Sequence, residues 1–371
     1  MKPNRIILKG YYGAGNIGDD LLMISAYKIL KELFPEDKIY VDTKSDYYKN
    51  LIPDAIKLTE NETNSTDLIF YGGGGLFFDF QKGDFKHLLL NNVVNLLGIK
   101  IFIYLFSLVR PKIKQALEQK IISFGLGVGP YPNSSKKYIR HLVLFNKMKF
   151  ISVRDEMSHS ILRKAGVPAF LHTDLVFNRD AFPFFKEIEQ QKVKKDGKPR
   201  IGIILRDWRF EDNNISKYIQ FYNENKDKFD IQFLVFNPTN DTGIIEQLKN
   251  SKISPILYSP RDLMSFLQIM KNQDIVITQR AHGAIIANQL NVPAICIGIE
   301  PKLKNVHHML PNSTLYLDKN FNLNDLNIIL MDKKKIDALR KATKSDAENN
   351  YKKISKLKND LNNFLKDNIQ E

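Results

Sequence analysis

Short apolar runs alternate along the first half of the chain with longer segments in which apolar residues recur at helical spacing. The runs RIILKG, KIYVD, DLIFYGGGG, KIISFGLGVGP and KFISVRD predict strands, and the segments 20–34, 137–148 and 156–166 predict helices. Asp19 or Asp20 is expected to cap the first of these helices. This alternation predicts a parallel sheet with helices on both faces.

The same alternation returns after a polar, lysine-rich stretch. The runs RIGIILR, DIQFLVF, DIVITQR and PAICIGI predict strands, and SPRDLMSFLQIMKN predicts a helix that starts at Ser259 and Pro260. The fold class is therefore α/β, with two doubly wound Rossmann-like domains facing each other across a cleft at the carboxyl ends of their strands. The expected boundaries are a domain at 1–185, a linker at 186–199, a second domain at 200–335 and a C-terminal helix at 336–371.

Composition narrows the class of protein. With 371 residues, 43% of them hydrophobic and 26% charged, the chain is typical of globular proteins, which excludes disordered and collagen-like classes. The single cysteine, Cys296, excludes a disulfide scaffold and a thiolate zinc cluster. The start has no signal-peptide pattern, so we expect a cytoplasmic protein. The net charge of +14 favours anionic partners: phosphorylated substrates, acidic membranes or nucleic acid.

Three glycine-rich stretches follow predicted strands. The loop GYYGAGNIGDD opens a helix, whose first amides would suit an anion, although a tight turn with aspartate caps explains it equally well. The stretches YGGGG and GLGVGP indicate close contact with a ligand, or else packing. The candidate residues in these stretches are Gly15, Asn16, Asp19, Gly73, Gly74 and Gly127.

Two arginines stand at predicted strand ends. Arg154 in SVRD either clamps a carboxylate or phosphate, or pairs with Asp155 or Glu156. Arg206 in ILRDW is followed by Trp208, the only tryptophan, which either stacks on a sugar or closes the domain interface.

The segment DIVITQRAHGAIIANQL carries the densest chemistry. Arg280 supplies a fixed positive charge, and His282, two residues later, titrates near neutrality and can transfer a proton. Lys302 and Lys304 follow the next strand. The sequence lacks HExxH, DxD and cysteine-cluster patterns, so we expect no metal.

Residues 88–114 form a strongly apolar segment flanked by lysines and arginines. Asn91, Asn92, Asn95 and Lys100 make it too polar to span a membrane. Two interpretations stay open: a buried helix pair on the sheet, or a helix that dips into the membrane interface beside basic residues.

Taken in order, GAGNIGD, YGGGG, GVGP, SVRD with TDLVF downstream, ILRDW and QRAHGAII resemble the polysaccharide pyruvyl transferase family, from about Gly13 to Lys304. The resemblance implies a glycosyltransferase-B-like fold and phosphoenolpyruvate as co-substrate, with no other cofactor. It also implies a pyruvate ketal placed on two hydroxyls of a cell-surface glycan or its lipid-linked precursor. Asp20 stands where the family pattern leads us to expect glutamate, and the apolar segment is longer and more basic, so the acceptor stays open.

The resemblance also suggests roles for the candidate residues. His282 would do acid/base work and Arg280 would bind the donor, as catalytic residues. Donor-binding residues would be Arg154, Arg206, Gly283, Lys302 and Lys304, and acceptor or loop residues would be Gly15, Asn16, Asp19, Gly73, Gly74, Gly127 and Trp208. The expected partners are phosphoenolpyruvate, a glycan and a membrane surface touched by 88–114, without nucleic acid. Two alternatives remain: a nucleotide-sugar glycosyltransferase, and a non-enzymatic basic protein that binds RNA or anionic lipid.

Overall fold

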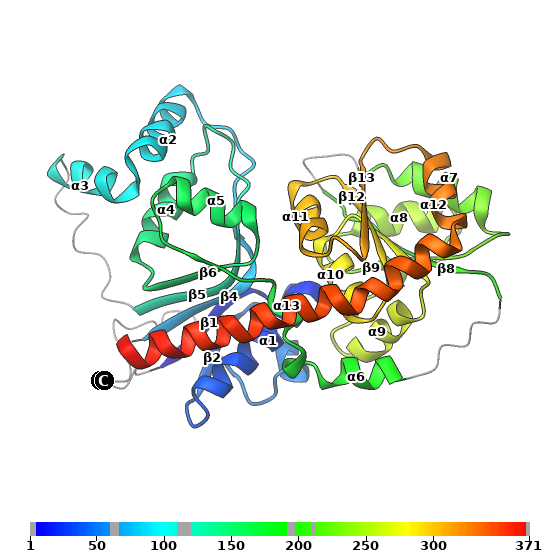
Figure 1. Cartoon of the computed structure of the whole chain (residues 1–371), viewed down its shortest axis with the longest axis horizontal. Coiled ribbons are helices and arrows are strands. Elements are labelled where there is room, and N and C mark those ends of the chain that lie inside the picture. The colour runs from blue at the N-terminus through cyan, green and yellow to red at the C-terminus, as the bar shows by residue number, and fades with distance from the viewer. Residues whose placement is uncertain (1–4, 60–66, 110–119, 191–196, 209–212, 369–371) are drawn as a thin grey trace. The chain divides into compact units, whose positions relative to one another are not determined.

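The computed structural model describes residues 5–59, 67–109, 120–190, 197–208 and 213–368. The chain forms two compact units (Figure 1). Unit 1 consists of Met1–Tyr12, Leu22–Leu175 and Lys353–Glu371, and unit 2 of Gly13–Leu21 and Val176–Lys352. Each unit is built around one parallel sheet, so the predicted α/β class with two doubly wound domains is confirmed.

The sheet of unit 1 has seven strands in the order β3-β2-β1-β4-β5-β6-β7, paired in parallel. Its inner strands are apolar over nearly their whole length because helices cover both faces. The strands are β1 (Ile6–Tyr12), β2 (Ile39–Thr43), β3 (Ile56–Lys57), β4 (Leu68–Phe77), β5 (Lys120–Val128), β6 (Phe150–Val153) and β7 (Phe170–Leu171).

Alternate residues of these strands enter two cores. On one face Ile69 and Ile121 pack with Leu142 and Phe145 of helix α4 and Leu162 of helix α5. On the other face the ring of Phe70 of β4 meets Phe34, directly after α1, and the ring of Phe150 of β6 meets Phe364 of helix α13 (Lys333–Asn368). The helices of this unit are α1 (Ile17–Leu33, whose first residues belong to unit 2), α2 (Phe85–Leu97), α3 (Ile99–Val109), α4 (Tyr138–Lys147) and α5 (Glu156–Lys164).

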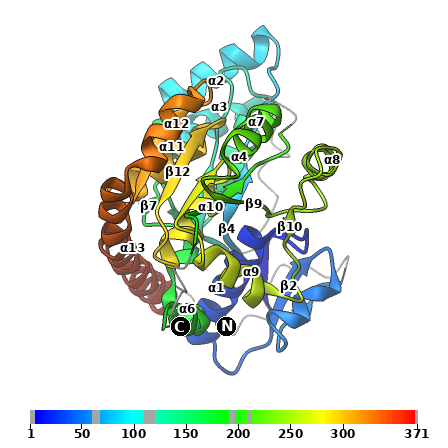
Figure 2. The same cartoon turned by 90° about the vertical axis from the view of Figure 1, so that its right-hand side faces the viewer.

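The sheet of unit 2 has six parallel strands in the order β10-β9-β8-β11-β12-β13, with the order reversing between β8 and β11. Strands β9, β10 and β12 of this sheet are labelled in Figure 2. The strands are β8 (Arg200–Ile204), β9 (Asp230–Val235), β10 (Ile256–Leu257), β11 (Ile275–Thr278), β12 (Ala294–Gly298) and β13 (Thr314–Asp318). The helices are α6 (Pro183–Gln190), α7 (Ile215–Asn225), α8 (Thr242–Asn250), α9 (Leu263–Lys271), α10 (Ala281–Gln289), α11 (Pro301–Met309) and α12 (Leu323–Met331).

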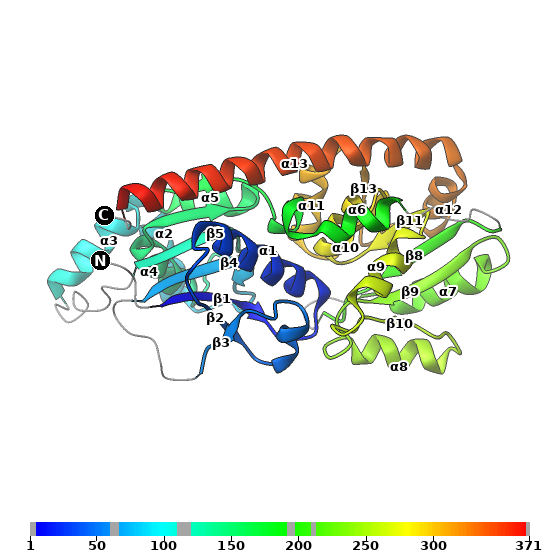
Figure 3. The same cartoon turned by 90° about the horizontal axis from the view of Figure 1, so that it is seen from below.

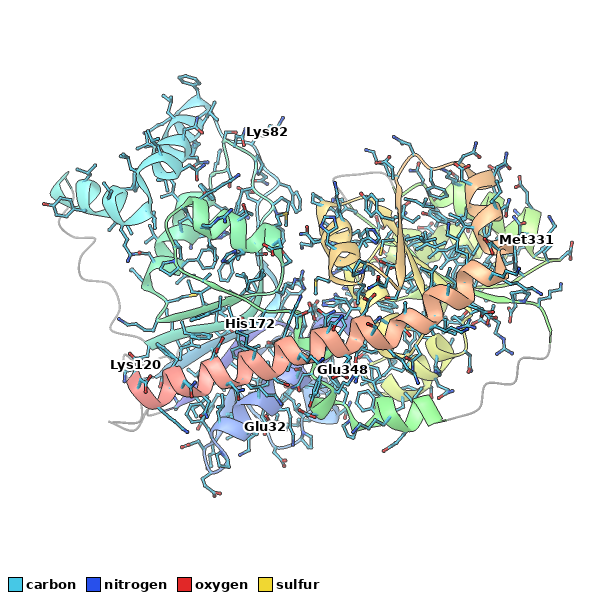
Figure 4. The ribbon with its side chains drawn as sticks, viewed as in Figure 1. Glu32, Lys82, Lys120, His172, Met331 and Glu348 are labelled. Atoms are coloured by element: carbon cyan, nitrogen blue, oxygen red, sulfur yellow. The ribbon has the colours of Figure 1, made fainter. Side chains whose placement is uncertain are left out.

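One long helix, α13 (Lys333–Asn368), runs without a break through both units (Figure 3). Its residues up to Lys352 belong to unit 2 and those from Lys353 to unit 1. In unit 1 it is fixed by His172, labelled in Figure 4, whose Nε2 lies 3.0 Å from Asp360 Oδ2. Lys358 also pairs with Glu32 of α1 at 2.9 Å.

Several expected boundaries differ from the structure. Helix α1 begins at Ile17, so Asp19 and Asp20 lie in its first turn rather than capping it, and Asn16 precedes the helix. Helix α9 begins at Leu263, because Ser259 and Pro260 form a turn before it. The start of the expected linker 186–199 lies in α6, and residues 191–196 lie outside the described residues.

Candidate functional site

The candidate residues of unit 2 lie where the sheet reverses its strand order. Strand β11 ends at Thr278, and Arg280 stands at the N-cap of α10. Thr278 Oγ1 accepts a hydrogen bond from the Arg280 amide at 2.9 Å, which holds this turn closed. Arg280 Nη2 lies 2.5 Å from both carboxylate oxygens of Asp241, and its Nε donates to the Leu205 carbonyl at 3.2 Å. The guanidinium is therefore fixed at the sheet's carboxyl edge.

His282, in the first turn of α10, lies against the loop that follows β1. A Cβ added at Gly18 would stand 2.1 Å from His282 Nδ1, so only glycine fits at position 18 without a shift. The loop is tied to unit 2 by the Ile17 amide, which donates to the Phe236 carbonyl at 3.2 Å. The glycine loop and the QRAHG segment, far apart in sequence, thus form one cluster.

Asp19 is the acidic member of this cluster. Asn16 Nδ2 donates to Asp19 Oδ2 at 2.7 Å, and Asn16 Oδ1 accepts from the Gly18 amide at 3.2 Å. Burial raises the pKa of the Asp19 carboxyl above its ordinary value, while His282, the Asn16 hydrogen bond, Arg280 and Lys302 each pull that pKa down. One carboxyl is thus surrounded by a histidine, an arginine and a lysine.

A second group lies beside this cluster at the ends of β8 and β12. Arg206 Nη1 pairs with Glu300 Oε1 at 2.6 Å, and its guanidinium lies 3.6 Å from the centroid of the Trp208 ring. Burial lowers the pKa of Arg206, and Glu300 opposes that shift. Trp208 is buried and has one face covered by Arg206. Lys304 and Glu300 line an open pocket of about 410 Å³ after β12.

In unit 1, Arg154 follows β6 and is buried. Its Nη1 donates to Asp174 at 2.7 Å, and its Nε lies 3.5 Å from Asp155. Of the two pairings that the sequence suggested, the one with Asp155 is present, and Asp174 is the nearer partner. A Cβ at Gly127 would stand 3.0 Å from the same guanidinium, so that glycine makes room for it.

The glycines of YGGGG lie inside a strand rather than after one. Strand β4 continues to Phe77, with Gly74 opposite Leu126 and Gly75 opposite Gly127 of β5. Gly73 and Gly74 have φ of +75° and +82°, which favours glycine there. The expected turn is therefore a distorted strand end, and a side chain at Gly73 would also press on Leu175.

The model of the polysaccharide pyruvyl transferase family matches residues 16–301. The chain belongs to that family. The matched region includes Asn16 and Asp19 at one end and Arg280 and His282 near the other. The resemblance noted from the motifs is thereby confirmed. No curated protein is similar enough to the chain to count as a match.

Solved structures show what fold this pyruvyl transferase family member adopts. It is similar to a glycosyltransferase from Rickettsia africae, with 14% identity, a TM-score of 0.56 and coverage of 99% of this chain and 100% of that one. It is also similar to Anabaena Alr3699/HepE in complex with UDP, with 11% identity, a TM-score of 0.56 and coverage of 98% and 100%. A third similar structure is the UDP-GlcNAc 2-epimerase of Neisseria meningitidis bound to UDP-GlcNAc, with 12% identity, a TM-score of 0.53 and coverage of 98% of this chain and 100% of that one. These likenesses confirm the glycosyltransferase-B type of fold.

Three carboxylates that hold the arginines of this family member were missed as site residues. Asp241 holds Arg280, Glu300 holds Arg206, and Asp174 holds Arg154. Asp241 and Glu300 precede α8 and α11, where the sequence gives only an ordinary helix-start signal. Their pairing with arginines depends on strand order, which no local pattern encodes. Within the described ranges no three His, Cys, Asp or Glu side chains are grouped to hold a metal ion.

Proposed function

We propose that this protein transfers the enolpyruvyl group of phosphoenolpyruvate to a cell-surface glycan or its lipid-linked precursor, where it becomes a ketal, with release of phosphate. Family membership supports a polysaccharide-modifying transferase. The observation that carries the proposal is the cluster in unit 2, where Arg280 is held by Asp241 and His282 meets the start of α1, which carries Asp19, at the switch point of the sheet. His282, Arg280 and Lys302 all lower the pKa of the Asp19 carboxyl, against the effect of burial.

The charges of the cluster match the donor. Phosphoenolpyruvate carries a phosphate and a carboxylate on one carbon, so it needs two cationic contacts close together. Arg280 and Lys302 supply them in our proposal, and the amides at the start of α10, including that of Gly283, add to the field. Arg206 and Lys304 lie at the neighbouring strand ends and neutralise further charge. Unit 2 is therefore the donor side, and unit 1 would receive the glycan.

The reaction needs one proton delivered to carbon and two hydroxyl protons removed. His282 donates a proton to the methylene carbon, which becomes a methyl group and leaves a cationic centre at the neighbouring carbon. A sugar hydroxyl bonds to that centre and loses its proton, and the bond to phosphate then breaks with its electron pair going to phosphate. A second hydroxyl closes the ketal and gives up its proton to the leaving phosphate.

Asp19 suits the removal of the first hydroxyl proton. Its raised pKa makes the carboxylate a stronger base than an exposed aspartate, and the surrounding cations stabilise the charge until the proton arrives. Asn16 fixes the carboxylate orientation through its 2.7 Å hydrogen bond. The glycine loop therefore contributes chemistry as well as a turn.

The test is incubation of the protein with phosphoenolpyruvate and a panel of lipid-linked and free oligosaccharides. We expect phosphate release that depends on an acceptor, and an acceptor whose mass rises by one pyruvate ketal. A parallel set receives nucleotide-sugars instead, because the similar Anabaena structure was solved with UDP. Consumption of a nucleotide-sugar without use of phosphoenolpyruvate would overturn the proposal in favour of glycosyl transfer.

A further inference from the structure

Helices α2 and α3 of unit 1 expose more apolar side chains than an ordinary surface helix does. They project from the rest of unit 1 in Figure 1, where they are drawn in cyan. A helix on the surface of a globular protein normally buries its apolar stripe and exposes its polar side chains. Here many large apolar side chains are exposed, and one of the two buried residues of α2 is the polar Asn91.

The inward face of α2 is anchored by asparagines. Asn91 is buried, and its Nδ2 donates to the carbonyls of Asn133 and Ser135, both at 3.0 Å. Asn95 Oδ1 accepts from the Tyr138 hydroxyl of α4 at 2.5 Å. Among the residues 85–105, whose burial the structure describes, Val94 and Ile99 are the fully buried apolar residues. Polar contacts therefore help to fix α2 on unit 1, and its exposed leucines are left for another surface.

The outward face is apolar at helical spacing. Leu96 is 84% exposed, Phe85 70% and Tyr104 64%. The exposed apolar residues are Phe85, Leu89, Val93, Leu96 and Leu97 on α2, and Ile101, Tyr104 and Leu105 on α3, which we call the α2–α3 face. Positions 85, 89, 93 and 96 fall on one side of a helix. A group of exposed large apolar side chains of this size is typical of an interaction site.

The charges around the α2–α3 face are mainly positive: between 82 and 105 the charged side chains are three lysines and one aspartate. Lys82, labelled in Figure 4, precedes α2, Lys86 lies in its first turn, and Lys100 lies in α3; all three are exposed. Asp84, the exposed N-cap of α2, lies 2.6 Å from His87 Nδ1. The sequence has no acidic residue between 85 and 117, although the whole chain has 41. Arg110, Lys112 and Lys114 of the segment discussed above lie outside the described residues. An apolar face with a net positive border complements a surface that is apolar inside and anionic outside.

The pair does not have the geometry of a simple span. Among the described helices none is by itself long and apolar enough to cross a bilayer. Phe85–Leu97 and Ile99–Leu105 reach that hydropathy only together, and they are bent by 115° at Gly98, whose φ is +80°. Two short helices at such an angle can lie along one side of a bilayer.

We propose that the α2–α3 face docks unit 1 on a bilayer that contains anionic lipid. The leucines and aromatic residues enter the boundary between headgroups and acyl chains, and Lys82, Lys86 and Lys100 lie at the lipid phosphates. A second copy of this chain would offer the same positive border and would repel this one, which favours the bilayer as the occupant. The inference does not depend on the reaction that unit 2 catalyses.

The experiment is flotation of the full chain with phosphatidylcholine vesicles and with vesicles of equal phosphatidylcholine and phosphatidylglycerol. We expect binding to the mixed vesicles and little to phosphatidylcholine alone. The double variant L96S/Y104S should bind at least about 100-fold more weakly, since burial of each large apolar side chain contributes about 1.5–3 kcal/mol. The variant K86Q/K100Q should bind the mixed vesicles roughly 10- to 30-fold more weakly, since each lysine near an anionic surface contributes about 1 kcal/mol.

The matched control is I328S/M331S on α12, which removes two apolar residues that are 69% and 62% exposed (Met331 is labelled in Figure 4). It should float like the original chain. Equal loss in L96S/Y104S and the control, or equal binding to both vesicle types, would overturn the proposal. The proposal would also be overturned if light scattering showed that the original chain is a dimer and that the L96S/Y104S variant is a monomer. Ketal formation on a free oligosaccharide should be unchanged in L96S/Y104S, so that failure of docking and failure of the proposed reaction are separate results.

Discussion

The two sheets of this protein each place an arginine between a strand and the helix that follows it, and the two arginines differ in their surroundings. Arg154 follows β6 and Arg280 follows β11, and each is paired with a buried aspartate, Asp174 or Asp241. Next to Arg154 stands Asp155, which caps α5 by accepting the Ser158 amide at 2.8 Å. Both neighbours of Arg154 are therefore protein carboxylates.

The turn at Arg280 has a different composition. Its guanidinium is also held by a carboxylate, that of Asp241. In addition, His282, Arg280 and Lys302 each lower the pKa of another carboxyl, Asp19. Helix α10 has no side-chain cap, whereas α5 has one. The same backbone arrangement thus holds an arginine between two carboxylates in unit 1 and, in our proposal, contributes to the reaction in unit 2. The residues that follow the arginine make the difference.

The largest expected effect is on the histidine of the unit 2 turn. H282A should reduce turnover of phosphoenolpyruvate about 100- to 10,000-fold, because it removes the proton donor. The matched control is H308A, since His308 is exposed on α11 of the same unit. Its turnover should equal that of the original chain. Kinetics and circular dichroism of both variants would check this, and full activity in H282A would refute the role of His282.

Removal of Arg154, the arginine of unit 1, should lower the free energy of unfolding. R154M leaves the fully buried Asp174 without its nearest cation, which should cost about 3–5 kcal/mol of the free energy of unfolding. R179M breaks the exposed pair with Glu348 and should cost under about 1 kcal/mol. Urea unfolding measures both. If R154M were as stable as R179M and bound phosphoenolpyruvate poorly, Arg154 would be a donor ligand, as the motif resemblance implies.

Substitution of Asp19, the carboxyl of the unit 2 cluster, should lower the activity without lowering the stability. The folded chain holds the Asp19 proton more tightly than the unfolded chain because burial raises its pKa, so ionisation at neutral pH costs stability. D19N removes that cost and should leave the protein as stable or more stable at pH 7, while turnover falls about 100-fold. D54N, at an exposed aspartate, should change neither quantity. A D19N protein that is both active and less stable would make Asp19 structural.

The smallest expected effect concerns His141 of unit 1, which contrasts with His282. Burial, and then Lys137 and Arg140, lower the pKa of His141 to about 4, and its Nδ1 lies 2.8 Å from the Tyr131 hydroxyl. The unfolded chain takes up this proton near pH 6.5, so the stability due to the neutral ring is complete above that pH. It is lost as the pH falls from 6.5 toward 4. Unfolding of H141Q between pH 8 and 5 should show a shallower pH dependence; an unchanged slope would count against this.

Local patterns predicted much of the fold, and tertiary pairing determined the rest. The inner strands of both sheets are continuous apolar runs, so their positions follow from the sequence. The two-residue edge strands β3, β7 and β10 have no such run. The glycines of YGGGG were expected to end a strand, because positive φ normally does so, yet pairing with β5 carries β4 through them.

The roles of the candidate residues stay predictions, and the sequence did not show how these residues are grouped. Arg280, His282, Asn16 and Asp19 were all candidates, yet the sequence assigned the loop residues to the acceptor. The loop belongs to unit 2 because Gly18 fits against the His282 ring and Ile17 bonds to Phe236. These contacts join positions more than 200 residues apart along the printed sequence, so only the folded chain could show them.

The most direct test of the account is transfer in deuterated water. If the cluster of unit 2 protonates the methylene carbon of phosphoenolpyruvate, the methyl group of each new ketal must carry one deuterium, read by mass spectrometry after exchange of the hydroxyl protons. The account predicts one deuterium in every methyl group with the original chain, and product formation about 100- to 10,000-fold slower with H282A. A pyruvylated glycan whose methyl group contains no solvent deuterium would contradict it.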